Sequence, residues 1–387
     1  MLYADLFNIF AIDYKTLIIV DKEELLKALT KVMEPDLGKD IVSLGLVSKF
    51  EFENNKVSFT VQVKNAAMHS RTRMQEACEF AIQRNFKNIQ VDCTVEGMSK
   101  VEANNSKMQN VKNIIAVASG KGGVGKSTVT SNLAIGLVKA GYKVGLVDAD
   151  IYGPSQPLMF DVQHEKPMGK EINGKQKIIP IESYGVKLLS IGFFSDVNQA
   201  VVWRGPMATK ALGQLLFDAE WGELDYLLID LPPGTGDIHL SLVQSLPITG
   251  AVIVSTPQNI ALADARKGVN MFKMESINVP VLGIVENMAW FTPAELPDNK
   301  YFIFGNEGAK NLAAQLDVPM LAQIPLVQSI RESGDAGRPA ILQDNTPSSK
   351  AFIELTAAVV KQVEWRNQAM EATKIVPVEY GQPKCST

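Results

Sequence analysis

Cysteine is scarce in this sequence of 387 residues, which contains only three: Cys78, Cys93 and Cys385. Three thiols cannot build a disulfide framework, and no two of them form a C-x-x-C pair. We therefore expect a protein of the reducing cytoplasm. Long hydrophobic runs are lacking too, because none approaches the roughly 18 apolar residues of a membrane span, and no membrane partner is expected.

A dominant charge is also absent. The chain has 38 Lys and Arg against 42 Asp and Glu, which gives a formal net charge of -4. This balance offers no general attraction to nucleic acid or to anionic lipid, so no nucleic-acid partner is expected. Hydrophobic residues make up 46% and charged residues 21% of the chain, as in an ordinary globular protein. Because the length exceeds one ordinary core, we expect two domains.

The first 20 residues are apolar but do not resemble a signal peptide. They include Asp5 and Asp13, lack a basic leading segment and offer no small-residue cleavage site. We interpret residues 1–20 as an N-terminal extension in front of the first domain.

A small α+β domain is predicted over residues 21–98. Residues 54–55 are both Asn and are expected to turn a hairpin, because apolar and polar residues alternate after them as in a half-buried strand. A helix is predicted from about residue 70 to residue 86. Cys78 on this helix and Cys93 on the strand after it take core-facing positions, where a thiol behaves as a small apolar group.

Residues 99–110 are polar and rich in Asn and Ser, which is typical of a linker. The larger domain is predicted over residues 111–370, with residues 371–387 as a tail. Its apolar runs are continuous rather than alternating, which is typical of strands buried on both faces. We therefore predict an α/β fold with a mostly parallel P-loop NTPase sheet and helices on both faces. The strand candidates are 114–118, 144–147, 186–191, 226–229, 251–254 and 281–285.

A glycine-rich run between the first strand of this domain and a helix matches G-x-x-x-x-G-K-[ST]. Backbone N–H groups of such a loop close around phosphate oxygens, and the helix N-terminus adds its positive dipole end. Lys126 is expected to reach the β- and γ-phosphates of ATP, and the Ser127 hydroxyl to bind Mg²⁺. The predicted nucleotide-binding residues here are Gly120, Lys121, Gly122, Gly123, Val124, Gly125, Lys126, Ser127 and Thr128.

Carboxylates follow two other strand candidates at the edge where an open α/β sheet binds its ligand. Asp148 and Asp150 end one buried run, and Asp230 ends another. Asp230 fits a Walker B residue that holds Mg²⁺ directly or through water. Gly234, a few residues later, fits the switch whose backbone N–H senses the γ-phosphate. These residues predict an ATP hydrolase.

Lys121 resembles the additional lysine of the deviant Walker A loop in the MinD/ParA class. That resemblance implies a homodimer in which each Lys121 reaches the nucleotide of the partner subunit. Such a lysine stabilises charge on the transferred phosphoryl group as an arginine finger does. The same resemblance implies that Asp150 orients the attacking water and that Asp148 supports the metal region.

The motifs SGKGGVGKS, DADIYGPS, WRGPM, LIDLPPGTGD and IVENM resemble, in this order and spacing, the Mrp/ApbC family of ATPases linked to iron–sulfur cluster assembly and transfer. The leading domain, with PDLGKDIVSLGLV, resembles the small domain of several iron–sulfur assembly proteins. The resemblance implies that Asn287 contacts the adenine, that Pro325 helps to close the base pocket, and that the partners are iron–sulfur apoproteins or assembly proteins.

One departure from the family concerns the cluster ligands. The family usually carries a C-x-x-C shortly after the ENM segment, where this chain has none, and only Cys385 is left to bind a cluster. No iron–sulfur ligands are therefore identified, although a bound cluster stays open. Three functions remain open: a cluster carrier or assembly factor, an ATP-dependent adaptor that binds no cluster itself, and a MinD/ParA-like positional switch.

Overall fold

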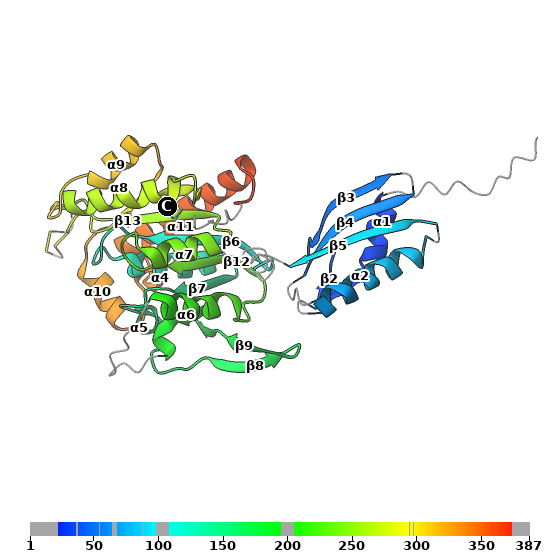
Figure 1. The fold of residues 1–387 in the computed structure, drawn as a ribbon. Coiled ribbons are helices and arrows are strands. Elements are labelled where there is room, and N and C mark those ends of the chain that lie inside the picture. The colour runs from blue at the N-terminus through cyan, green and yellow to red at the C-terminus, as the bar shows by residue number, and fades with distance from the viewer. Residues whose placement is uncertain are drawn as a thin grey trace, which may run out of the picture. The chain divides into compact units, whose positions relative to one another are not determined.

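The fold is described from a computed structural model, in which the described residues form two compact units, one within residues 1–103 and one within residues 104–387 (Figure 1). Three predicted segments lie wholly or mostly outside the described residues, namely the extension, the linker and the tail. The described residues are 22–35, 38–53, 55–63, 68–86, 88–97, 108–194, 205–293, 295–296 and 298–373.

The smaller unit is the predicted α+β domain. A three-stranded sheet pairs β3 with β4 antiparallel and β4 with β5 parallel, so that α2 forms the crossover between the two parallel strands. Cys78 and Cys93 are buried in its core, as predicted. The elements are α1 (Lys22–Leu29), β1 (Met33–Glu34), β2 (Lys39–Asp40), β3 (Val47–Glu53), β4 (Lys56–Val63), α2 (Met68–Gln83) and β5 (Gln90–Gly97).

The larger unit contains an eight-stranded sheet in the order β10-β11-β7-β12-β6-β13-β14-β15. Every neighbouring pair is parallel except β10 with β11, which confirms the predicted fold class. The strands are β6 (Val111–Ala118), β7 (Val144–Asp148), β10 (Ile181–Ser183), β11 (Val186–Ser190), β12 (Leu224–Asp230), β13 (Gly250–Ser255), β14 (Val281–Glu286) and β15 (Met320–Gln323). A separate hairpin joins β8 (Met168–Ile172) to β9 (Lys175–Ile179).

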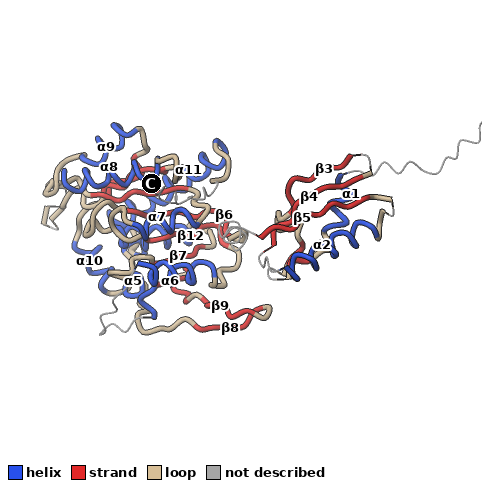
Figure 2. Tube along the Cα trace, in the orientation of Figure 1, coloured by secondary structure: helices blue, strands red, loops and turns tan. Residues whose placement is uncertain are grey.

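Helices cover both faces of this sheet (Figure 2). One apolar core packs α6, α7, α8 and α9 against one face, and a second core packs α4 and α11 against the other. Apolar runs in the central strands serve both cores at once, which is why those strands are continuously hydrophobic. The helices are α4 (Lys126–Lys139), α5 (Gln156–Met159), α6 (Gly205–Phe217), α7 (Asp237–Ser245), α8 (Asn259–Lys273), α9 (Gly308–Leu316), α10 (Gln328–Asp335) and α11 (Pro347–Ala369).

The strand order positions the site. β6 lies between β12 and β13, and β12 lies between β6 and β7, so the carboxyl ends of β6, β7 and β12 share one edge of the sheet. Met108, predicted to belong to the linker, is buried in the core of the larger unit. The packed part of this unit therefore begins before residue 111.

Candidate active site

The chain between β6 and α4 forms a glycine-rich loop at the carboxyl edge of the sheet. Gly123 and Gly125 have φ values of 82° and 80°, in the left-handed region that side chains disfavour. The helix α4 begins at the next residue, Lys126, so its positive dipole end lies at the loop. The amide Nδ2 of Asn287 donates a hydrogen bond of 2.8 Å to the carbonyl of Val124, which braces the loop from the end of β14.

Gly120 lies where no side chain fits. A Cβ there would overlap the backbone carbonyl of Asp264 and would lie 2.6 Å from the amide nitrogen of Ala265, both in α8. Gly120→Ala is therefore expected to lower the free energy of unfolding by about 1–3 kcal/mol, measured by denaturant unfolding without nucleotide. Gly122→Ala is the control, because its Cβ would meet only Pro233 at 3.9 Å. Equal losses in both variants would contradict this steric explanation.

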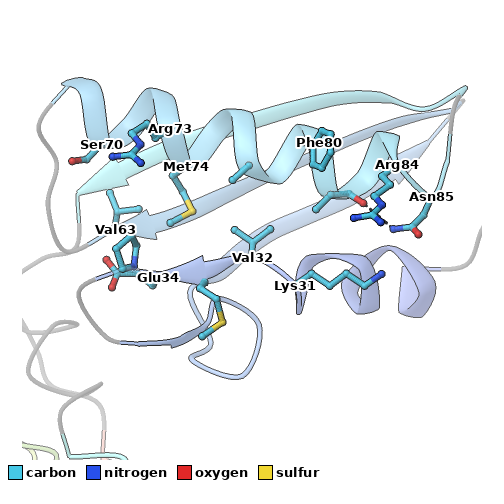
Figure 3. Close-up of a pocket in the computed structure, with 14 residues that line it drawn as sticks. Lys31, Val32, Glu34, Val63, Ser70, Arg73, Met74, Phe80, Arg84 and Asn85 are labelled. Atoms are coloured by element: carbon cyan, nitrogen blue, oxygen red, sulfur yellow. Dashed lines mark hydrogen bonds between the residues drawn. The ribbon is translucent and has the colours of Figure 1, made fainter. Parts of the chain in front are cut away.

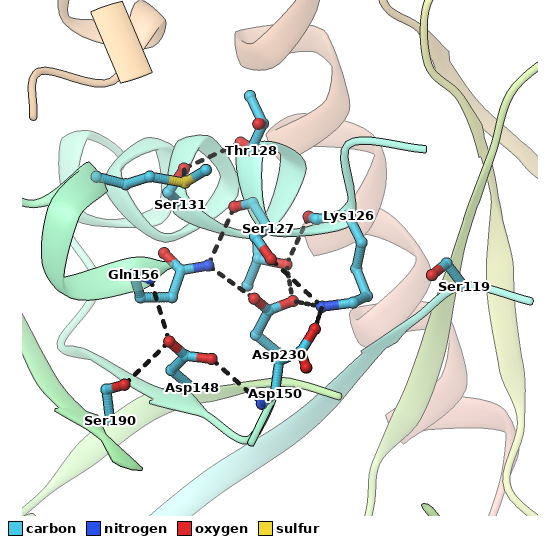
Figure 4. A network of polar contacts seen from close by, with 12 residues as sticks. Ser119, Lys126, Ser127, Thr128, Ser131, Asp148, Asp150, Gln156, Ser190 and Asp230 are labelled. Atoms are coloured by element: carbon cyan, nitrogen blue, oxygen red, sulfur yellow. Dashed lines mark hydrogen bonds and ion pairs between the residues drawn. The ribbon is translucent and has the colours of Figure 1, made fainter. Parts of the chain in front are cut away.

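A buried ion pair joins the start of α4 to the end of β12. Lys126 Nζ lies 2.5 Å from Asp230 Oδ1, with only 6% of the lysine side chain and none of the aspartate exposed (Figure 4). Thr130 donates its hydroxyl to the same carboxylate oxygen at 3.0 Å. Ser127 Oγ lies 3.4 Å from Lys126 Nζ. The fold thus brings together the predicted phosphate lysine and both predicted metal residues.

Two further carboxylates, Asp148 and Asp150, approach from the end of β7. Burial, and after it the nearby Asp230 carboxylate, raise the pKa of Asp148 to about 7. Ser190 Oγ donates to Asp148 at 3.0 Å. Asp150 Oδ2 lies 4.0 Å from Lys126 Nζ, and burial raises the pKa of Asp150 against the opposing effect of that lysine. Two carboxylates, Asp230 and Asp150, therefore lie within ion-pair distance of one buried ammonium group, and Asp148 is close enough to Asp230 for its pKa to be affected.

Gln156, at the start of α5, completes this network and was not predicted from the sequence. Its Nε2 donates to Asp230 Oδ2 at 2.9 Å and to the Ser127 carbonyl at 3.1 Å. Its backbone N–H donates to Asp148 Oδ2 at 3.1 Å. The fully buried side chain leaves Oε1 without a hydrogen-bond partner among the described residues. Its only sequence signal is its position shortly after the DAD motif.

The hydroxyl oxygen of Ser127 and the carboxylate oxygens of Asp230 are suitable ligands for Mg²⁺. This hard cation takes six oxygen ligands and usually keeps several waters. Ser127 and Asp230 would hold the ion, and the orphaned Oε1 of Gln156 is an acceptor that a metal-bound water can satisfy. When bound, Mg²⁺ supplies positive charge to the phosphate oxygens. The excess of carboxylate over ammonium charge favours such a cation.

Lys121 and Gly234 both form hydrogen bonds to Ser119. The Lys121 side chain is exposed, and its carbonyl accepts a hydrogen bond of 3.0 Å from Ser119 Oγ. The Gly234 N–H, predicted to sense the γ-phosphate, donates to the Ser119 carbonyl at 2.9 Å. The contact of this N–H with the γ-phosphate stays a prediction, and it requires this hydrogen bond to break.

Asn287 and Pro325 belong to two segments that lie side by side. The backbone N–H of Ala289 donates to the Ile324 carbonyl at 2.9 Å, which places Pro325 next to the residues that follow Asn287. The Asn287 amide is already used to brace the glycine-rich loop. Adenine contacts by Asn287 and Pro325 stay predictions.

The thiols of the described residues do not form a cluster site. Cys78 and Cys93 are buried in the core of the smaller unit, and Cys385 lies outside the described residues. The described part of the chain also contains no group of three or more His, Cys, Asp or Glu residues placed to hold a metal ion. None of its helices is long and apolar enough to cross a membrane. Trp203 and Arg204 of the WRGPM motif likewise lie outside the described residues.

Comparison with known proteins agrees with the resemblance found in the sequence. A protein from Synechocystis sp. named iron–sulfur cluster carrier protein is 41% identical over 345 residues, 88% of this chain and 96% of that protein. A Dictyostelium discoideum protein named iron–sulfur cluster transfer protein NUBPL is 48% identical over 259 residues, covering 66% of this chain and 78% of its own.

A solved structure of a nucleotide-binding protein from Archaeoglobus fulgidus in complex with ADP is 36% identical, with a TM-score of 0.56, and the match covers 66% of this chain and 97% of that one. The profile of an iron–sulfur cluster assembly protein matches residues 22–92. The profile of NUBPL iron-transfer P-loop NTPases matches residues 110–360, which is more than half of the sequence. The chain therefore belongs to the NUBPL iron-transfer P-loop NTPase family.

Proposed function

We propose that the chain is a cytoplasmic, dimeric Mg-ATP hydrolase that carries or helps to assemble iron–sulfur clusters and delivers them to apoproteins. One observation carries the hydrolase part: the buried group of Lys126, Asp148, Asp150 and Asp230 at the glycine-rich loop. The names of the relatives support the role in cluster delivery.

Hydrolysis proceeds by in-line attack of water on the γ-phosphate. Lys126 exchanges its ion pair with Asp230 for the phosphate oxygens, which leaves the Asp230 carboxylate for the metal region. Asp150 orients the attacking water, and Asp148, which accepts a hydrogen bond from Ser190, supports the metal region. Ser127 and Asp230 would hold Mg²⁺, which would supply positive charge to the phosphate oxygens. The Lys121 side chain, exposed on each subunit, stabilises the transferred group at the nucleotide of its partner.

Gln156→Ala is expected to weaken binding of MgADP about 10- to 100-fold, because residues that orient a metal's ligands usually carry effects of this size. Binding of ADP in EDTA should change little, since Gln156 touches the metal residues Asp230 and Ser127 rather than the loop glycines. Isothermal titration with and without Mg²⁺ measures both affinities. Gln176→Ala, on the β8–β9 hairpin, is the control. An equal loss in EDTA would contradict a role at the metal.

The placement of cysteines favours a second candidate, an adaptor that binds no cluster itself. Cys78 and Cys93 are buried, and between Cys93 and Cys385 the sequence contains no cysteine. A four-thiolate cluster shared by two subunits needs two free thiols from each. An adaptor instead uses ATP to place a partner's cluster near its acceptor.

Iron and sulfide analysis after anaerobic reconstitution tests the choice between carrier and adaptor. A carrier retains stoichiometric iron and sulfide through gel filtration and loses them in Cys385→Ser. An adaptor stays colourless in both forms but speeds cluster transfer from a loaded donor to an apoferredoxin in an ATP-dependent manner. Absence of cluster retention together with absence of faster transfer would contradict the delivery function and leave the ATPase intact.

A further inference from the structure

A groove crosses the smaller unit between α2 and the segment that joins α1 to β1 (Figure 3). It encloses about 640 Å³. Its floor is apolar and buried, whereas Met33 and Phe80 at its edges are 53% and 66% exposed. The buried residues of the floor are Val32, Val63, Met74 and Ala81.

The α2 side of the groove follows helical spacing. Ser70, Arg73, Ala77 and Phe80 line it at intervals of three or four residues, so they share one face of the helix. Arg84 directly follows the end of α2 and continues this face, because its N–H still donates to the Phe80 carbonyl. Ala77, in the middle of this face, lines the groove with a small side chain, which leaves more room for an apolar side chain of a partner than a larger residue would. From Ser70 to Arg84 this face is about 21 Å long, enough for roughly four turns of a partner helix.

The rim of the groove is positively charged. Lys31, Arg73 and Arg84 are exposed, and none of the three has an ion-pair partner among the described residues. The one carboxylate in the lining, Glu34, is 2% exposed and has interactions of its own. Three cations without an ion-pair partner in the described part of the chain, placed around an apolar floor, complement apolar side chains flanked by acidic ones.

We propose that this groove docks an acidic amphipathic helix of a partner protein that gives clusters to this chain or receives them. Apolar side chains of that helix fill the groove at Ala77 beside Phe80 and Met33. Its Asp and Glu residues pair with Arg73 and Arg84 at opposite ends, about 16 Å apart along α2. A concave floor suits a helix better than a flat lipid surface. That the partner gives or receives clusters rests on the proposed function, whereas the docking of an acidic helix rests on the groove alone.

The test uses the whole chain and a fluorescein-labelled helical peptide of about 15 residues, with leucines on one face and glutamates elsewhere. Arg73→Glu combined with Arg84→Glu should weaken peptide binding at least about tenfold in fluorescence anisotropy. The same variant should gain affinity for a matched peptide with lysines in place of the glutamates. Arg71→Glu is the control, because Arg71 lies on α2 outside the groove and should change neither affinity.

Four outcomes would overturn the proposal. The first is an unchanged affinity in the double charge reversal, or an equal loss in Arg71→Glu. The second is binding to phosphatidylglycerol vesicles that is lost in the double charge reversal, which would show that the groove binds lipid. The third is loss of dimer in Phe80→Ser by light scattering, which would assign it to a second copy. The fourth is peptide binding only after removal of residues 1–20, which would assign it to that segment.

ATP hydrolysis is measured in parallel for each variant. A variant that loses peptide binding but hydrolyses ATP normally has a defect in the groove alone. Absence of hydrolysis in the unaltered chain would instead contradict the proposed ATPase. The docking surface and the proposed ATPase therefore fail in different assays.

Discussion

Replacing Lys121 with alanine should lower ATP turnover about 10³-fold or more, by analogy with cationic fingers supplied by a partner subunit. Nucleotide binding should remain close to that of the unaltered chain, because Lys121 is exposed and the buried ion pair of the site is made by Lys126. Steady-state phosphate release measures turnover, and titration with ADP measures binding. Lys170→Ala, an exposed lysine of β8, should change neither.

Mixing two inactive variants tests whether Lys121 acts across the dimer. The Lys121→Ala subunit keeps Asp150, and the Asp150→Ala subunit keeps Lys121, so one composite site in each mixed dimer is complete. Random exchange should then restore about a quarter of normal turnover, since half of the dimers are mixed and half of their sites are complete. If Lys121 acts within its own subunit, mixing restores no turnover. That result would exclude action of Lys121 at the nucleotide of the partner subunit.

Replacing Asp150 with alanine should slow turnover about 10²- to 10⁴-fold, the usual contribution of a group that positions or deprotonates the nucleophile. Binding and dimer closure should survive, because Lys126 and Asp230, which are paired in this structure, both remain to bind the phosphates and the metal ion. The variant should therefore accumulate as an ATP-bound dimer, detected by gel filtration with light scattering. Asp344→Ala, an exposed aspartate of the same unit, is the control. Near-normal turnover, or a monomer in saturating ATP, would contradict the assigned role.

The central sheet could be predicted because its strands are buried on both faces and therefore apolar throughout. The hairpin of β8 and β9 was missed, since its residues are exposed or half-buried and leave no apolar run. β15 was missed for a related reason: it has four residues, and only one of them is buried. Hydrophobic patterns report burial, so exposed and very short strands escape them.

The site was predictable where a motif fixes both residue type and position. Lys126, Ser127 and Asp230 meet because strand order brings the ends of β6 and β12 together. Gln156 escaped prediction because its contacts depend on how the chain turns back after β7, which no local pattern encodes. Asn287 was predicted to contact a ligand, yet its amide also braces the loop. A single sequence does not distinguish a ligand contact from a contact to the backbone.

The two buried thiols of the smaller unit allow transient opening of its core to be measured by chemical labelling. Both sulfurs are buried, so an alkylating reagent reaches neither of them while the core is closed. The neighbouring Cys93, followed by burial, also raises the pKa of Cys78, which lowers the reactivity of that thiol. Each modification event then records a moment at which this core opened. A partner that binds and stabilises this unit should lower the labelling rate, so partner binding can be detected without a probe on the partner.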